Sequence, residues 1–150
     1  MVVNRQRGIA VAVGPLEEFV GRARGALHFP KDGVTVCLVS DAAIARLNRR
    51  YRGKSGPTDV LSFPAQGRRK SSRTASRGPA RGIQAGYVGD IAISPAAARR
   101  NARRDSRSLT EELRVLILHG MLHLAGYDHE TDDGRMDSLE RRLRRRLGLR

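Results

Sequence analysis

Apolar residues recur along the chain at two different spacings, which predict short strands and amphipathic helices in mixed order. Runs rich in β-branched side chains predict strands over residues 9–13, 34–39, 59–63 and 87–94. Helical spacing of apolar residues predicts helices over residues 15–27, 41–53, 95–104, 109–124 and 134–147. Because strands and helices do not strictly alternate, the expected fold class is α+β, with a small mixed sheet of about four strands packed with about five helices.

One of these helices differs from the others, because it is apolar nearly all round. Ser108 and Glu111 form a capping-box pattern at its start. Residues 113–124 then expose no continuous polar face, and Gly126 follows directly after the helix. A helix that is hydrophobic on every side is buried, so this segment is expected to be the central helix of the fold.

The segment 66–82 has a different composition from the rest of the chain. It contains six basic residues, no acidic residue and no large apolar side chain. Such a segment buries too little surface to offset its ordering entropy, so it is expected to be a disordered basic loop. An arm that orders on RNA and a solvated insertion without a role are both compatible with this composition.

The length, net charge and cysteine content of the chain limit the kinds of protein that it can be. The chain has 150 residues, which favours a single domain over residues 1–150. Its formal net charge of +14 favours a polyanionic partner such as nucleic acid, although a solubilising surface would carry the same charge. Cys37 is the only cysteine, so neither an intrachain disulfide nor a disulfide-linked partner is expected. No apolar run is long enough for a membrane span, and the expected location is cytoplasmic, with no membrane partner.

Three of the four histidines fall within eleven residues of the central helix and the turn after it. His119 and His123 are four residues apart, so both imidazoles lie on one face of the helix, about 6 Å apart along its axis. Gly126 readily adopts the left-handed conformation that ends a helix, which lets His129 return toward the same point. The spacing predicts one metal ion held by His119, His123 and His129.

Three neutral protein ligands leave a fourth tetrahedral position for water, which is the catalytic pattern of zinc sites. Zn2+ is the expected ion, one per chain, with Ni2+ or another divalent ion as the alternative. The spacing of the three histidines and Gly126 also matches the metzincin proteases. Those enzymes place a general-base Glu directly after the first histidine, and this chain has Gly120 there, so peptidase activity is not expected.

Three blocks of sequence, in order, resemble the YbeY family of bacterial endoribonucleases. They are HGMLHLAGYDH at 119–129, YRGK at 51–54 followed by PTDVLSFP at 57–64, and GDIAISP at 89–95. The resemblance implies a single metal-dependent endoribonuclease domain, specific for single-stranded RNA and zinc-dependent. It further implies a role in 16S rRNA 3′-end maturation and ribosome quality control, with the ribosome or ribosomal proteins as partners.

The resemblance also implies roles for individual residues. Arg52 matches the family's functional arginine and is expected to face the substrate phosphate, which a guanidinium can grip through two oxygens. Asp128, beside His129, is a candidate general base. Asp59 and Asp90 are candidates for orienting the imidazoles, although a structural role in loops or turns is slightly favoured. The alternative function is a non-catalytic RNA-binding ribosome-assembly factor with a structural metal.

Overall fold

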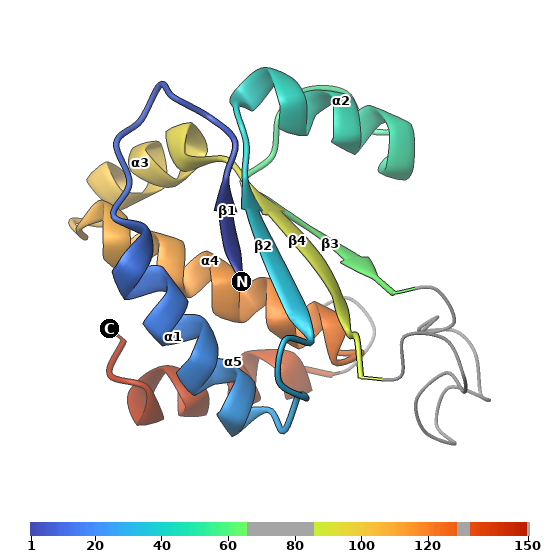
Figure 1. Ribbon diagram of the computed structural model, residues 1–150, viewed down its shortest axis with the longest axis vertical. Coiled ribbons are helices and arrows are strands. Elements are labelled where there is room, and N and C mark those ends of the chain that lie inside the picture. Colours follow the sequence, from blue (N-terminus) through green and yellow to red (C-terminus); the bar gives the residue numbers. More distant parts are fainter. Residues whose placement is uncertain (66–85, 129–132, 150) are drawn as a thin grey trace.

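The computed structural model describes residues 1–65, 86–128 and 133–149, and Figure 1 shows their arrangement. These residues contain a four-stranded sheet and five helices, which confirms the expected α+β class. The elements in chain order are β1 (Val2–Asn4), α1 (Val13–Ala26), β2 (Val34–Leu38), α2 (Asp41–Arg52), β3 (Val60–Pro64), β4 (Gly89–Ile93), α3 (Pro95–Arg104), α4 (Leu109–Leu124) and α5 (Arg135–Arg146).

The sheet is mixed and has the strand order β1-β2-β4-β3. β1, β2 and β4 are parallel, whereas β3 runs antiparallel to β4 and forms one edge. In that antiparallel pair Val60 lies opposite Ile93 and Pro64 lies opposite Gly89. Pro64, which has no N–H to donate, is tolerated because it ends an edge strand.

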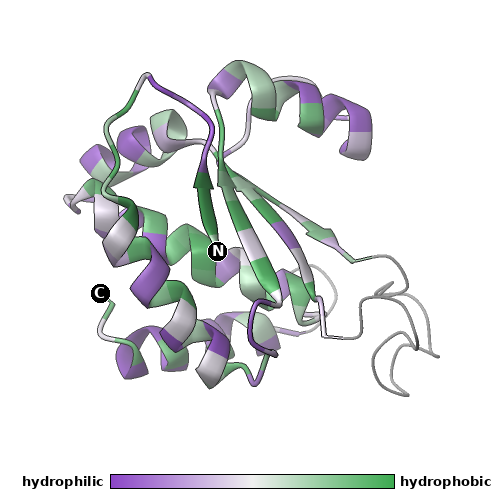
Figure 2. Cartoon of the chain, viewed as in Figure 1, coloured by the Kyte–Doolittle hydropathy of each residue, from purple (hydrophilic) through white to green (hydrophobic). Residues whose placement is uncertain are grey.

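The main hydrophobic core lies between one face of the sheet and helices α1 and α4. α4 packs across β3 and β4, while α1 lies against β1 and against α4 itself. α3 and α5 pack against α4 from its other sides. Figure 2 shows hydrophobic colour on the strands and α4 and hydrophilic residues on α2, α3 and α5. The expectation of a central buried helix is therefore confirmed, since ten of its residues are buried.

α2 covers the opposite face of the sheet (Figure 1). Ile44 and Leu47 of this helix pack on Leu61 and Phe63 of β3 and on Ala92 of β4. The period-two alternation of β3 thus turns Leu61 and Phe63 toward α2 and leaves Ser62 facing α4. At this edge of the sheet, β3 lies between α2 on one face and α4 on the other.

Three helices begin directly after a serine that caps them, and one of these caps, Ser108, is predicted above. The hydroxyls of Ser40, Ser94 and Ser108 each accept a hydrogen bond from the backbone N–H three residues later. Each bond satisfies one of the N–H groups that a helix leaves without an internal partner. Pro95 follows the second cap as the first helical residue, where its missing N–H costs nothing.

The N-terminal strand lies at a different position from the one predicted. The strand predicted over residues 9–13 is wrong, because these residues are coil up to the first turn of α1, and the N-terminal strand is Val2–Asn4. The strand at the N-terminus depends on pairing with β2, and this pairing cannot be read from the residues next to it in sequence.

The basic segment 66–82, predicted to be a disordered loop, lies outside the described residues. Within residues 1–65, 86–128 and 133–149, every helix is too short or too polar to cross a bilayer.

Candidate metal centre and active site

His119 and His123 project from the same face of α4 toward a common point. Their Nε2 atoms are 3.2 Å apart, and the ring centroids are 4.7 Å apart with the ring planes 77° from parallel. Two imidazoles bound to one tetrahedral zinc ion, each at a Zn–N distance of 2.0–2.1 Å, have nitrogens about 3.3 Å apart. The observed separation fits this donor set.

The hydrogen-bond partners of the two Nδ1 atoms determine that the Nε2 atom of each imidazole faces the common point. His123 Nδ1 lies 3.1 Å from the backbone oxygen of Tyr127, and a carbonyl only accepts, so Nδ1 carries the hydrogen. His119 Nδ1 lies 3.1 Å from Glu140 Oε1, and a carboxylate likewise accepts. In the neutral rings both Nε2 atoms then present lone pairs to each other. Two facing lone pairs repel unless a cation lies between them, which is the chemical reason that the pair suits a metal ion.

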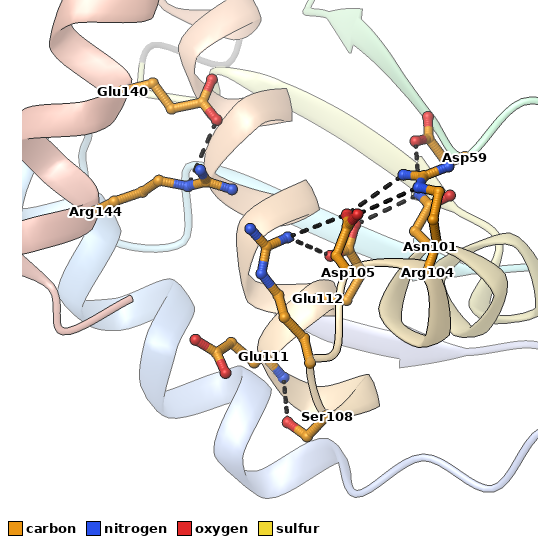
Figure 3. Close-up of polar contacts among 10 residues, drawn as sticks. Asp59, Asn101, Arg104, Asp105, Ser108, Glu111, Glu112, Glu140 and Arg144 are labelled. Atoms are coloured by element: carbon orange, nitrogen blue, oxygen red, sulfur yellow. Dashed lines mark hydrogen bonds and ion pairs between the residues drawn. The ribbon is translucent and has the colours of Figure 1, made fainter. Parts of the chain in front are cut away.

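Glu140 is a site residue that sequence reasoning missed. It comes from α5, its side chain is only 13% exposed, and Arg144 Nε lies 3.8 Å from its other oxygen. Figure 3 shows the Arg144 side chain directed at this carboxylate. A carboxylate on the far nitrogen of a metal-ligating histidine fixes the ring and increases its basicity. Its position four residues after the buried Met136 and three before the buried Leu143 places Glu140 on the inner face of α5, and that spacing could have identified it.

The end of α4 has the geometry that the sequence predicts from Gly126. Gly126 has a φ of +103°, its N–H donates to His123 O at 3.0 Å, and the N–H of Tyr127 donates to Leu122 O at 3.1 Å. This pair of bonds is a Schellman motif, which reverses the chain after a helix. Asp128 follows as a half-buried residue. His129 lies outside the described residues, so its place as third ligand stays a prediction.

At Gly120, α4 lies close against the sheet. The Ser62 hydroxyl donates to Gly120 O at 3.0 Å. A Cβ at position 120 would lie 2.9 Å from Ile91 Cγ2, a separation that real Cβ atoms essentially never show. A glutamate here would require the Ile91 side chain or α4 to shift, so the packing disfavours a side chain at the position of the metzincin general base.

Arg52 is the last residue of α2 and is exposed on the α2 side of the sheet. The structure brings His119 and His123 together, but it places Arg52 across the edge strand β3 from them. Figure 1 shows α2 and α4 both running toward this edge.

The other end of α2 is held by hydrogen bonds to Asp41. Ser94 donates to Asp41 Oδ1 at 2.6 Å, and Arg100 donates to Asp41 Oδ2 at 3.1 Å. The Ser94 hydrogen bond is the main cause of a lowered pKa of the Asp41 carboxyl, with Arg100 adding to it.

Asp59 and Asp90 do not hold the imidazoles. Asp59 Oδ2 accepts from Asn101 Nδ2 at 3.1 Å, and its backbone oxygen accepts from Ser94 N at 3.0 Å. The Asn101 amide also lies 3.4 Å from Glu112 (Figure 3). The buried Glu112 carboxylate pairs with Arg107 at 2.8 Å. Asp90 accepts from the Tyr87 hydroxyl. Both aspartates therefore have the structural role that the sequence slightly favoured.

No group of three or more His, Cys, Asp or Glu side chains converges on one point within the described ranges 1–65, 86–128 and 133–149. The Nε2 atoms of two predicted ligands, His119 and His123, lie close together, and the third predicted ligand falls in the gap at 129–132. A hollow of about 350 Å3 lies beside Tyr127, lined also by Asp133, Arg135 and Arg142. Tyr127 also provides the backbone oxygen that lies 3.1 Å from His123 Nδ1.

Comparison with known proteins identifies the family. Residues 15–148 match the family model described as endoribonuclease YbeY. The chain is 42% identical over 149 residues to the endoribonuclease YbeY of Koribacter versatilis, covering 99% of this chain and 86% of the relative. It is 35% identical over 150 residues to that of Syntrophotalea carbinolica, covering 97% and 93%.

A solved structure has a similar fold. The solution structure of a protein from Thermotoga maritima superimposes with a TM-score of 0.58 at 28% identity, covering 98% of this chain and 89% of that one. The matched residues 15–148 include β2, β3, β4, α2 and the histidine helix α4. The chain belongs to the endoribonuclease YbeY family.

Proposed function

We propose that this chain is a zinc-dependent endoribonuclease that cleaves single-stranded RNA and acts in 16S rRNA 3′-end maturation and ribosome quality control. The observation that carries the proposal is the histidine pair, with two Nε2 atoms 3.2 Å apart and both Nδ1 atoms engaged by acceptors. Family membership supports RNA as the substrate. The net charge of +14 also favours a polyanion.

His119 and His123 hold the ion, and His129 completes the set in a single domain over residues 1–150. Zn2+ is the proposed ion, with Ni2+ or another divalent ion as the alternative. When bound, the ion supplies a Lewis acid for the phosphate and lowers the pKa of water. Glu140 and the Tyr127 carbonyl orient the two imidazoles, so that their lone pairs stay aimed at one point.

Arg52 is proposed to grip the phosphate and share the charge that develops on it, because a guanidinium matches two phosphate oxygens. Its exposed position at the end of α2 leaves it accessible to a strand that passes around the β3 edge. Asp128, near the predicted third ligand, is proposed as the group that moves a proton. The proposed setting is the cytoplasm, with the ribosome or ribosomal proteins as partners.

The test combines metal content with cleavage of a labelled single-stranded RNA. Wild type is expected to carry about one ion per chain and to cut the RNA. His123→Ala is expected to lose the metal and the cleavage, whereas Arg52→Ala keeps the metal and loses cleavage. The Arg46→Ala variant, which removes another exposed arginine of α2, controls for a general loss of charge.

Metal-loaded wild type that binds RNA but never cuts it would remove the catalytic claim and support the assembly-factor alternative. An Arg52→Ala variant that cuts at the wild-type rate would remove Arg52 from the chemistry and leave the metal proposal intact.

A further inference from the structure

Tyr51 exposes an aromatic ring at the end of α2, next to Arg52. Its side chain is 57% exposed, and the only other large hydrophobic residue exposed among the described positions is Met1. The exposed part of this ring is accessible to a binding partner, and a tyrosine offers such a partner both an apolar ring and a polar hydroxyl.

The Tyr51 ring is held in a defined orientation. It packs in a T-shaped contact on Phe63 of β3, with ring centroids 5.2 Å apart and planes 74° from parallel. The chain after the helix is fixed as well, since Asn48 Nδ2 donates to Gly56 O at 3.0 Å and Gly53 N donates to Arg49 O at 3.1 Å. The ring is thus a fixed feature of the surface.

The charged residues that flank Tyr51 in sequence are all basic. Between Asp41 and Asp59 the chain has five basic residues and no acidic one. Four of the five flank the ring within three residues and are exposed: Arg49, Arg50, Arg52 and Lys54. The guanidinium carbon of Arg50 lies 5.5 Å from the ring centroid, within range of a cation–π contact. We call Arg49, Arg50, Tyr51, Arg52 and Lys54 the Tyr51 platform.

We propose that the Tyr51 platform binds single-stranded RNA by stacking a nucleobase on the Tyr51 ring while its basic side chains hold the neighbouring phosphates. This inference rests on the proposed function and names where that substrate binds. Proteins that bind single strands combine basic side chains with aromatic rings in this way, because every base has a flat face. A base in a duplex has both faces covered, so the platform selects for unpaired RNA.

The position of the Tyr51 platform relative to Arg52 and the histidine pair also suits RNA cleavage. Arg52 follows Tyr51 directly, so a base stacked on the ring belongs to a nucleotide close to the phosphate held by Arg52. The Phe63 contact ties the platform to β3, and Ser62 on the other face of β3 bonds to Gly120, one residue after His119. The edge strand therefore sets the distance between the platform and the histidines.

The test uses the absence of tryptophan in this chain. In the Tyr51→Trp variant the new residue is the only tryptophan, and a stacked base quenches its fluorescence. The variant is mixed in a stopped-flow instrument with single-stranded RNA, with RNA duplex, and with an abasic ribose-phosphate polymer of equal length. We expect saturable quenching by the single strand and little by the duplex or the abasic polymer. An Arg46→Trp variant, also on α2, is the matched control and should not be quenched.

Affinity and kinetics give a second readout. Tyr51→Leu is expected to weaken RNA binding at least about fivefold and to raise KM, because loss of one base stack costs that much or more. Tyr51→Phe, which keeps the ring, should bind as wild type does. Lys54→Ala should lower the salt dependence of binding, by about one unit of slope, whereas Tyr51→Leu should leave that slope unchanged.

If RNA is bound and cut, but the fluorescence of the Tyr51→Trp variant does not change and Tyr51→Leu binds normally, the platform is wrong and the proposed function stands. Equal quenching by the abasic polymer also overturns the platform, because the ring then senses charge alone. If wild type neither binds nor cuts RNA, the proposed function fails and the platform with it.

Discussion

Gly120→Ala is a sharp test of how closely α4 approaches the sheet. The added methyl group would lie 2.9 Å from Ile91 Cγ2, 3.1 Å from Ile91 Cδ1 and 3.2 Å from Ser62 Oγ. Ile91 is fully buried in the main core, so its Cγ2 has no open space into which it can move. The variant must push α4 away from β3 and β4 or force Ile91 out of its rotamer.

The magnitude follows from three contributions. Overpacking a filled core costs about 1–3 kcal/mol. Movement of the helix also endangers the bond from Ser62 to Gly120 O, worth about 1 kcal/mol. Alanine in place of glycine in a helix interior returns up to about 1 kcal/mol. The free energy of unfolding is therefore expected to fall by about 1–3 kcal/mol.

Gly21 provides the matched control, because it is also a glycine inside a helix. It is exposed on α1, and a Cβ there would meet nothing within 4 Å. Gly21→Ala should therefore gain the helix propensity alone and stabilise the protein by up to about 1 kcal/mol. The same substitution is expected to have opposite signs at the two sites.

Urea unfolding of each variant measures these changes, with the midpoint and slope fitted separately. Combining Gly120→Ala with Ile91→Ala, which removes both the Cγ2 and the Cδ1 atoms, should cost less than the sum of the two single variants. A Gly120→Ala protein as stable as wild type would refute the close packing of α4 on β4. Additive effects of the two substitutions would show that Ile91 is not the obstacle.

Glu140→Gln should weaken metal binding about 10- to 100-fold in a chelator competition, because the carboxylate orients and polarises a ligand imidazole. Arg107→Met should lower the free energy of unfolding by about 3 kcal/mol in urea, since it leaves the buried Glu112 carboxylate without its ion pair. Burial, and then the hydrogen bond to Asp90, raise the pKa of Tyr87 to about 12. The neutral phenol therefore contributes stability that is fully present below about pH 10 and is lost as the pH rises through about 12.

Each of these predictions has a control and a contrary outcome. Glu18→Gln, an exposed carboxylate on α1, should leave metal affinity unchanged, and a Glu140→Gln protein with wild-type affinity would exclude Glu140 from the site. Arg100→Met breaks a more exposed ion pair and should cost no more than about 1 kcal/mol, so an equal loss at Arg107 and Arg100 would contradict the argument. Tyr87→Phe should lose less stability than wild type above pH 10; parallel curves would disprove the raised pKa.

The helices and the histidine pair could be predicted because their causes are local. Ser40, Ser94 and Ser108 cap the helices that directly follow them, and each cap needs only the next three residues. His119 and His123 share a face through the geometry of one helix. In each case the residues that determine the feature are neighbours in sequence.

Features that depend on distant partners could not be predicted in this way. β1 is a strand because Val2 pairs with Val36, and the more strongly apolar residues 9–13 have no such partner strand in the described sheet. The carboxylate beside His119 comes from Glu140 on another helix, whereas the sequence suggested Asp59 and Asp90. Tertiary packing determines which groups hold the histidine rings, so a local pattern identifies the candidate metal ligands more readily than the residues that orient them.

The polar network at the start of β3 has a consequence for mispairing during folding. A strand that slips by one residue turns every side chain to the other face. In β3 such a slip would turn Phe63 toward α4 and remove the Ser62 hydroxyl from Gly120. Asp59, bonded through its side chain to Asn101 and through its backbone to Ser94, loses both partners in a slipped hairpin. The polar groups of β3 can all form their hydrogen bonds in one alignment only, so this edge strand disfavours wrong pairings. The spacing between the Tyr51 platform and the histidines depends on that alignment.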